Sequence, residues 1–169
     1  MQTFGNDLEA ITEEIEINLS GTIRMVMQFL PHLRAQPSAA IVNVSSGLAF
    51  NPYPIAPIYG ATKAAIHSFT QSLRVQLKRT NIQVFELAPP AVATPLNHVF
   101  AEELKGTPVM SVEKLVAAAL QGLERDQPEI RVGFANVSKF LSRVAPGFIL
   151  KQLSKPVDLM LAQMKQLNG

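Results

Sequence analysis

The chain has 169 residues, a length typical of a single domain that can bury a sizeable core. A hydrophobic fraction of 47% and a charged fraction of 17% exclude an intrinsically disordered protein. The net charge of +2 is too small to indicate a nucleic-acid partner, although the pI is about 9.0. Cysteine is absent, which excludes disulfides, thiol nucleophiles and cysteine metal sites. No metal site is predicted, because His32, His67 and His98 show no ligand spacing with acidic residues.

The N-terminal segment carries acidic residues where a signal peptide would be basic and apolar. No apolar run reaches the roughly 20 residues that a membrane-spanning helix needs. We therefore expect a cytoplasmic protein that neither crosses a membrane nor binds nucleic acid.

A long helix is expected over residues 6–34, with Pro31 at its end or just past its last turn. Asn18 lies in the middle of this helix, where asparagine has a low helix propensity. It is either a tolerated surface residue or a residue with a functional role. The apolar stripe expected to face the core consists of Ile11, Ile15, Leu19, Ile23, Met27 and Leu30.

A buried strand is expected next, over Ala39–Val44, because this run is apolar and rich in β-branched residues. Ser46 follows just beyond its carboxyl end, and a loop punctuated by glycine and proline leads to a second helix. That helix is expected over Ile58–Arg79 and carries Tyr59 and Lys63 four residues apart, on one face. Because ligands of open α/β sheets bind beyond the carboxyl ends of the strands, this placement indicates a candidate acid–base centre.

These residue types suit proton transfer to a carbonyl or from an alcohol. A tyrosine phenol has a reference pKa near 10, and bringing it near 7 takes roughly 4 kcal/mol in favour of the phenolate. A cation about 4 Å away supplies about that much at an effective dielectric near 20, and Lys63 is a candidate. Ser46 can hold the substrate oxygen while Tyr59 donates or removes the proton. Taken alone, however, a Tyr–Lys pair at this spacing is common on ordinary helix surfaces.

Two more strands are expected, over Ile82–Leu87 and Glu129–Val132, with a helix capped by Ser111 between them. Strands that alternate with helices indicate an α/β fold with a parallel sheet. Residues 95–110 are expected to form a loop. From Phe134 onward, two weak helical segments broken near prolines either pack on the domain or contact a membrane surface or a partner.

Three spacings carry a resemblance to a known family. Tyr59 and Lys63 match the Tyr-x-x-x-Lys motif of the short-chain dehydrogenases/reductases. Ser46 lies 13 positions before the tyrosine, where that family usually has its catalytic serine. Asn18 lies 28 positions before the serine and resembles the catalytic asparagine of the family's preceding long helix. Agreement of three independent spacings makes the resemblance specific.

The resemblance implies a Rossmann-like three-layer α/β/α fold, with a parallel sheet between long flanking helices. It implies NADP or NAD as the cofactor and a small carbonyl or alcohol compound as the substrate. The resemblance further implies that Tyr59 is the general acid–base residue and that Ser46 holds the substrate oxygen. Lys63 is implied to lower the pKa of Tyr59 and to bind the ribose of the cofactor. Asn18 is implied to lie at a local kink whose freed carbonyl holds a proton-relay water beside Lys63.

The segment Ala88–Thr94 follows the strand expected over Ile82–Leu87. It resembles the family's Pro-Gly-x-Val-x-Thr sequence. Pro89, Val92 and Thr94 are therefore implied to contact the nicotinamide end of the cofactor, whereas Pro90 replaces the family's glycine. The following loop resembles a mobile substrate lid. The two long helices commonly form a four-helix interface in the family, which implies a homodimer or a higher oligomer.

None of the nine glycines forms a Gly-x-Gly, so the phosphate-binding turn of a dinucleotide fold is missing. The resemblance thus covers only the C-terminal half of the family's Rossmann domain, over residues 1–133, and residues 134–169 are a helical tail. The sheet would correspond to the family's strands 5, 6 and 7, which leaves an open edge at Ala39–Val44 and favours oligomer formation. Two functions stay open: an NAD(P)(H)-dependent oxidoreductase, or a catalytically silent half-domain that is a remnant or an interaction module.

Overall fold

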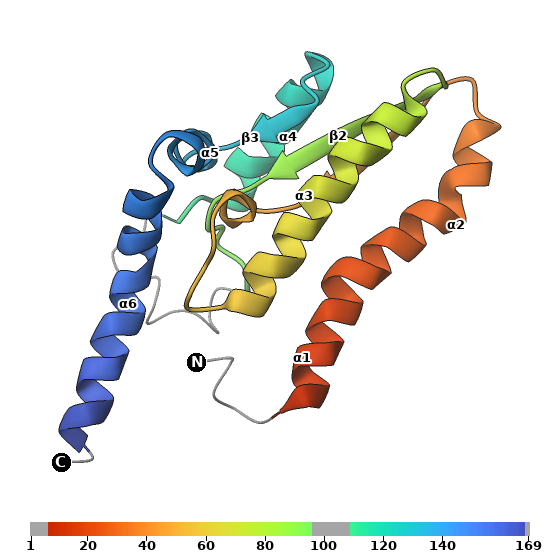
Figure 1. The fold of residues 1–169 in the computed structure, drawn as a ribbon. Coiled ribbons are helices and arrows are strands. Elements are labelled where there is room, and N and C mark those ends of the chain that lie inside the picture. Colours follow the sequence, from red (N-terminus) through yellow and green to blue (C-terminus); the bar gives the residue numbers. More distant parts are fainter. Residues whose placement is uncertain (1–6, 96–108, 168–169) are drawn as a thin grey trace.

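The computed structural model describes residues 7–95 and 109–167, which form one three-layer α/β unit (Figure 1). The strands are β1 (Ala39–Val44), β2 (Ile82–Ala88) and β3 (Glu129–Arg131). The helices are α1 (Leu8–Ile15), the π-helical turn η1 (Glu16–Gly21), α2 (Thr22–Arg34), the short 3-10 helix η2 (Gly47–Phe50), α3 (Pro57–Leu77), α4 (Val112–Glu124), α5 (Ala135–Val144) and α6 (Pro146–Leu167).

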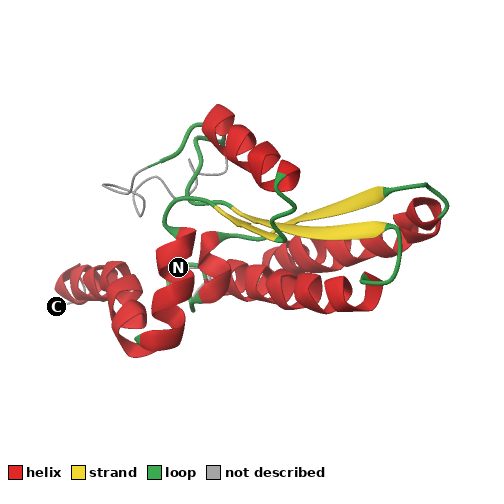
Figure 2. Ribbon diagram, turned by 90° about the horizontal axis from the view of Figure 1, so that it is seen from above, coloured by secondary structure: helices red, strands yellow, loops and turns green. Residues whose placement is uncertain are grey.

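The three strands form a parallel sheet in the order β1-β2-β3. Ala39 is paired with Ile82 at one end of the first ladder, and Val44 with Leu87 at the other. Helix α4 lies on one face of the sheet, and the long helices lie on the other (Figure 2). The expected α/β fold with a parallel sheet and long flanking helices is therefore confirmed.

The elements α1, η1 and α2 form one helix from Leu8 to Arg34. Its central turn, η1, has π-helical instead of α-helical hydrogen bonding. Asp7 begins it, since the Asp7 carboxylate accepts the backbone N–H of Ala10. Pro31 lies inside α2, so the expectation that it would end the helix is wrong. Met27 was expected on the core face but is 57% exposed, and Val26 is buried instead. Steps of four residues drift away from the 3.6-residue period of a helix, which explains this error.

The core lies between the sheet and the long helices. In β1, Ile41 and Asn43 point inward and are buried, whereas Val42 and Val44 point to the opposite face and are partly exposed. The Asn43 side chain donates to the Thr70 hydroxyl over 3.0 Å, which satisfies a buried amide and fixes β1 against α3. The fully or nearly buried members of the cluster are Val26, Ile41, Leu73, Leu77, Ile82 and Val84.

Helix α4 packs closely on β3 through Gly122. A Cβ atom at Gly122 would lie 2.6–2.9 Å from three side-chain atoms of Ile130. We expect Gly122→Ala to lower the free energy of unfolding by about 1–2 kcal/mol, because overpacking outweighs the gain in helix propensity. Gly147→Ala is the matched control, since no atom lies within 4 Å of a Cβ there. Urea unfolding of both variants measures this, and equal stability would contradict the packing argument.

Helix α5 belongs to the same core as the sheet, because Ala135 and Ser138 are fully buried. Helix α6 continues through Pro156, where a break was expected, and extends away from the sheet (Figure 1). In the described part of the chain, no helix is both long and apolar enough to cross a membrane. Most of the expected lid, residues 96–108, lies outside the described residues.

Candidate active site

The candidate site lies at the carboxyl ends of β1 and β2. Ser46 directly follows Ser45 and caps η2, because its Oγ accepts the backbone N–H of Leu48 over 3.1 Å. The next amide, of Gly47, donates to the carbonyl of Pro89 over 2.8 Å. These two bonds hold the Ser46 hydroxyl at the edge of the sheet where ligands of α/β folds bind.

Helix α3 brings Tyr59 to this edge. The hydroxyl of Ser46 lies close enough to the phenol of Tyr59 to lower its pKa, so the structure brings these two expected site residues together. Burial raises the pKa of Tyr59 above 10.0, the Ser46 hydrogen bond lowers it, and the negative charge of Glu14 raises it further. The net direction is upward, so Tyr59 is protonated at neutral pH and can donate a hydrogen bond to a substrate oxygen.

The upward shift of the Tyr59 pKa is measurable by ultraviolet titration. The chain has two tyrosines, Tyr53 and Tyr59, and no tryptophan, so Tyr53→Phe isolates the signal of Tyr59. We expect its phenol to ionise above pH 10.0, since burial penalises the phenolate. A titration midpoint below pH 10 in this variant would contradict the arrangement described here.

Lys63 takes a different position from the one expected. Its Nζ donates to the backbone carbonyl of Val44 over 3.2 Å and lies 5.7 Å from the centroid of the Tyr59 ring. Burial lowers the pKa of Lys63. The pKa of Tyr59 is raised mainly by burial, and the ammonium that was expected to stabilise the phenolate is directed at the strand instead.

Asn18 lies in the π-helical turn η1, which packs against α3. A π-turn contains one extra residue and loosens the regular hydrogen-bond ladder, and such turns occur often at functional sites. The backbone carbonyl of Asn18 accepts the hydroxyl of Thr22 over 2.9 Å. The helix is therefore irregular at Asn18, and part of the hydrogen-bonding capacity of that carbonyl is used inside the helix.

The segment expected to face the nicotinamide lies beside the Ser46 loop. Pro89 provides the carbonyl that binds Gly47, and Val92 forms an isolated bridge with Met110. The hydroxyl of Thr94 donates to the carbonyl of Val92 over 3.4 Å. The structure thus places this segment and Ser46 at one end of the sheet, on two neighbouring strands.

The sequence interpretation missed a buried polar network behind the site. The carboxylate of Glu86 is fully buried, accepts the hydroxyl of Ser45, and lies 2.8 Å from Nδ1 of His67. Its residues come from β2, from α3 and from the position that directly follows β1, so no local spacing reveals them. The one available signal is that Glu86 is the single polar residue in the run Val84–Ala88, which is otherwise apolar.

One group of potential metal ligands occurs in this network, where none was expected. Ligand atoms of His67, Glu86 and Glu129 lie within 4.8 Å of one another. The carboxylate of Glu129 is already bound by Lys139 and Arg131. These cations compensate its charge, and Ser45 and His67 satisfy Glu86, so the network is complete as an internal ion-pair cluster.

Helix α5 fixes the Ser46 loop from the other side. The hydroxyl of Ser138 donates to the carbonyl of Gly47 over 2.9 Å, and the Asn51 side chain donates to Ser138 Oγ over 2.7 Å. All three residues are buried. A segment about ninety residues further along the chain therefore determines the conformation of the loop that carries Ser46.

Comparison with known proteins identifies the family. A family model described as "short chain dehydrogenase" matches residues 3–105, which contain Asn18, Ser46, Tyr59 and Lys63. The chain belongs to the short-chain dehydrogenase family. The chain is 46% identical, over 70% of its length, to an uncharacterized oxidoreductase, DltE, of Bacillus subtilis. The match covers 47% of that relative, so the chain spans about half the length of this curated relative.

Solved short-chain dehydrogenases have the same fold. One from Burkholderia cenocepacia, in complex with NADP, superposes with a TM-score of 0.79 at 27% identity, over 89% of this chain and 63% of that chain. Another from Sphingobium yanoikuyae, in complex with NADPH, superposes with a TM-score of 0.68 at 25% identity. That superposition covers 92% of this chain and 57% of the other chain. The Rossmann-like fold is therefore shared over most of this chain, and these two short-chain dehydrogenases bind nicotinamide cofactors.

Proposed function

We propose that this chain carries the acid–base centre of an NAD(P)(H)-dependent oxidoreductase that interconverts carbonyl and alcohol groups of small molecules. The observation that supports this most is the placement of Ser46 and Tyr59 next to each other at the carboxyl end of a parallel sheet, with Ser46 held there by the capping of η2. Lys63 lies near enough to turn toward the Tyr59 ring. The chemistry of these groups is proton transfer to or from an oxygen.

In the proposed reduction, Ser46 and Tyr59 hold the substrate oxygen by hydrogen bonds, and Tyr59 gives its proton to that oxygen. A bound nicotinamide supplies the hydride that adds to the carbonyl carbon. The phenolate left on Tyr59 is stabilised by the ammonium of Lys63, once Lys63 leaves Val44. Lys63 and a water held near Asn18 return a proton to Tyr59. Oxidation of an alcohol uses the same residues in the opposite direction.

The described residues fit one end of the cofactor. Pro89, Val92 and Thr94 lie beside the Ser46 loop, which is where a nicotinamide ring must lie to reach a carbonyl held by Tyr59. No Gly-x-Gly turn occurs in the 169 residues to bind a pyrophosphate. We infer that groups other than such a turn, from a partner or from rearranged packing, would hold the adenine side.

A second candidate is a catalytically silent half-domain that acts as an interaction module. The observation that favours it is the direction of Lys63, which binds the strand edge rather than Tyr59. In this case the residues of the acid–base centre persist without a hydride source, and the exposed edge of β1 carries the function.

Fluorescence titration of the purified chain with NADPH and NADH separates the two. Micromolar binding of either nucleotide supports the oxidoreductase, and a screen of small ketones and alcohols then defines the substrate class. Absence of binding up to millimolar concentration favours the silent module. Thr94→Ala is the matched probe of the nicotinamide side, since it removes a hydroxyl without disturbing the sheet.

A further inference from the structure

Helix α5 packs on the domain with its small side chains and exposes its large apolar ones. Ala135 and Ser138 are the residues that it buries. Val137, Phe140 and Val144 lie three and four positions apart, so they share the opposite side of the helix. Their exposed fractions are 49%, 64% and 60%. A helix on a globular domain normally turns its apolar side inward, so this reversed arrangement marks an interaction surface.

The exposed apolar residues continue beyond both ends of α5. Phe134 directly precedes the helix, and Phe148 lies in the first turn of α6. The α5–α6 surface is defined here by five exposed residues, Phe134, Val137, Phe140, Val144 and Phe148. It lies on the β3 side of the sheet, because Lys139 of α5 donates to the carboxylate of Glu129 in β3. Figure 1 shows α5 and α6 on the opposite side of the fold from α1 and α2.

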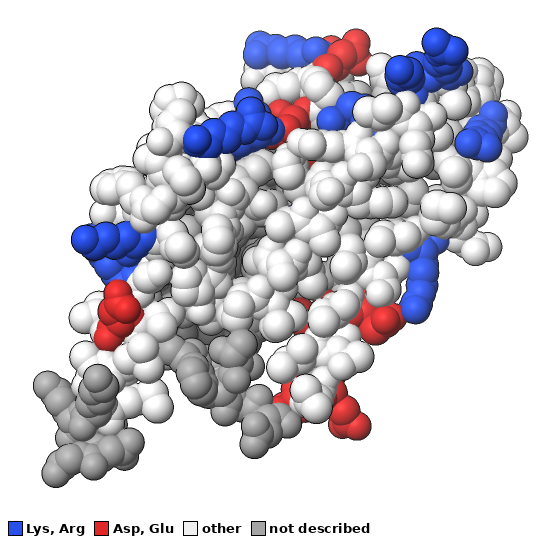
Figure 3. Space-filling model, viewed as in Figure 1, with Lys and Arg blue, Asp and Glu red and all other residues white. Residues whose placement is uncertain are grey.

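Positive charge accompanies the α5–α6 surface. Residues 130–157 contain no aspartate or glutamate. Arg143 is exposed near the end of α5, and Lys151 and Lys155 are exposed on α6. These two lysines share one face of α6 with Phe148, three and seven positions before them. Among the residues that the structure describes, no acidic side chain forms an ion pair with any of the three cations. Figure 3 shows basic side chains over the upper part of α6, with an acidic one further along this helix.

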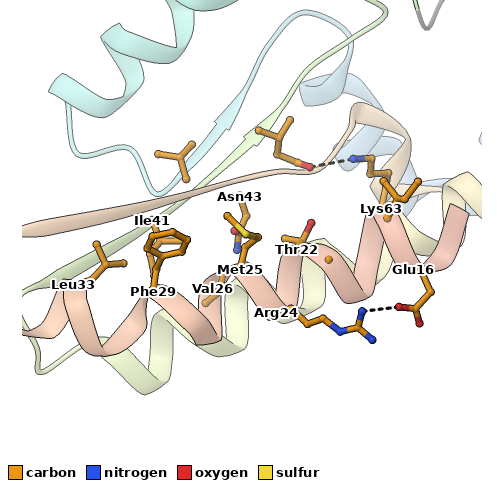
Figure 4. Close-up of a pocket in the computed structure, with 14 residues that line it drawn as sticks. Glu16, Thr22, Arg24, Met25, Val26, Phe29, Leu33, Ile41, Asn43 and Lys63 are labelled. Atoms are coloured by element: carbon orange, nitrogen blue, oxygen red, sulfur yellow. Dashed lines mark hydrogen bonds and ion pairs between the residues drawn. The ribbon is translucent and has the colours of Figure 1, made fainter. Parts of the chain in front are cut away.

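A second group of exposed apolar residues has a different charge environment. Met25 and Phe29 rise from α2 into a groove beside β1 (Figure 4). The cation at this groove, Arg24, is paired with Glu16 over 2.9 Å, so its charge is compensated. The α5–α6 surface therefore combines apolar side chains with uncompensated cations, and the groove does not.

We propose that the α5–α6 surface lies against a lipid bilayer that contains anionic lipids. Its phenylalanines and valines enter the boundary between head groups and acyl chains, while its arginine and lysines bind the lipid phosphates. A second copy of this chain fits the surface less well. Pairing two such surfaces would bring Arg143, Lys151 and Lys155 close to their own counterparts, and like charges repel. The proposal does not depend on the oxidoreductase function.

Vesicle flotation of the full chain tests the proposal. We expect binding to phosphatidylcholine vesicles that contain about 30% phosphatidylglycerol, and at least about tenfold weaker binding to phosphatidylcholine alone. Arg143→Gln and Lys151→Gln should each weaken binding by about fivefold, since one cation near an anionic surface contributes about that factor. Phe140→Ser should weaken binding by at least about tenfold, because it removes a large apolar side chain from the bilayer boundary.

Phe29→Ser is the matched control for Phe140→Ser. Phe29 is also a phenylalanine on a helix and is 50% exposed, but it lies in the groove beside β1. This variant should float with anionic vesicles as the wild type does. Circular dichroism that matches the wild type shows that each variant is folded.

Three results would overturn the proposal. One is a chain that does not float with the anionic vesicles at lipid concentrations up to about 1 mM. The second is vesicle binding that Phe29→Ser abolishes and Phe140→Ser leaves unchanged, because it would place the contact in the groove beside β1. The third is a dimer in light scattering that Phe140→Ser dissociates and that anionic vesicles leave intact, because a second copy would then cover the surface.

Discussion

Tyr59→Phe is expected to reduce carbonyl turnover by about 10²–10⁴-fold, since this is the contribution of a positioned general acid. The substitution removes one oxygen and leaves the ring, which is partly buried between α3 and the Ser46 loop. Binding of NADPH should therefore change by less than about twofold. Consumption of NADPH at 340 nm measures the rate, and fluorescence titration measures the binding.

The control for this experiment lies six residues earlier. Tyr53→Phe removes the other phenol of the chain and should keep turnover near that of the wild type. A Tyr59→Phe variant that retains more than about a tenth of the activity would show that another group donates the proton. Lys63→Met should lower turnover as well, because the phenolate formed in the reaction would then lack its cation.

His67→Ala is expected to lower the free energy of unfolding by about 1–3 kcal/mol, the cost of leaving a buried carboxylate without one of its hydrogen-bond partners. The carboxylate of Glu86 has no exposed surface, and Nδ1 of His67 lies 2.8 Å from it. Without the imidazole, this carboxylate keeps Ser45 as a donor but faces the nearby carboxylate of Glu129. For a chain of this length the Tm should fall by roughly 5 °C.

Replacing both partners distinguishes the polar contact between His67 and Glu86 from simple loss of packing. His67→Phe with Glu86→Leu replaces both groups by apolar ones, and this variant should be more stable than His67→Ala. Gln71→Ala removes the neighbour on the other side of the imidazole and should cost little, since that contact is exposed. If the double variant is less stable than His67→Ala, the network stabilises the fold through packing rather than through the contact between His67 and Glu86.

The sequence predicted the local features of the site well. β-branched residues and alternation identified β1, and the spacings of Asn18, Ser46, Tyr59 and Lys63 identified the family. These features are encoded over short stretches, either by propensity or by residues that share a helix face. Family membership and the fold are confirmed, whereas the roles of the four residues stay predictions.

Features that depend on distant segments could not be predicted. The π-turn at Asn18 has no signal in residue propensity, and only the family resemblance implied a local kink there. The position of Lys63 depends on the exposed edge of β1, since an unpaired carbonyl there attracts the ammonium. The network around Glu86 joins three elements, and sequence spacing carries no signal for such contacts.

The bonds between α5 and the Ser46 loop have a consequence for folding order. Ser138 is 91 positions from Gly47 and 87 from Asn51, so these are contacts of high sequence separation. Closing such a long loop costs entropy before any contact is gained, and pairs of this kind form late. We expect β1 and β2 to be paired while residues 47–51 still fluctuate. In amide-exchange measurements during refolding, residues 47–51 should therefore become protected last. Ser46 thus reaches its final position only after nearly the whole chain has folded around it.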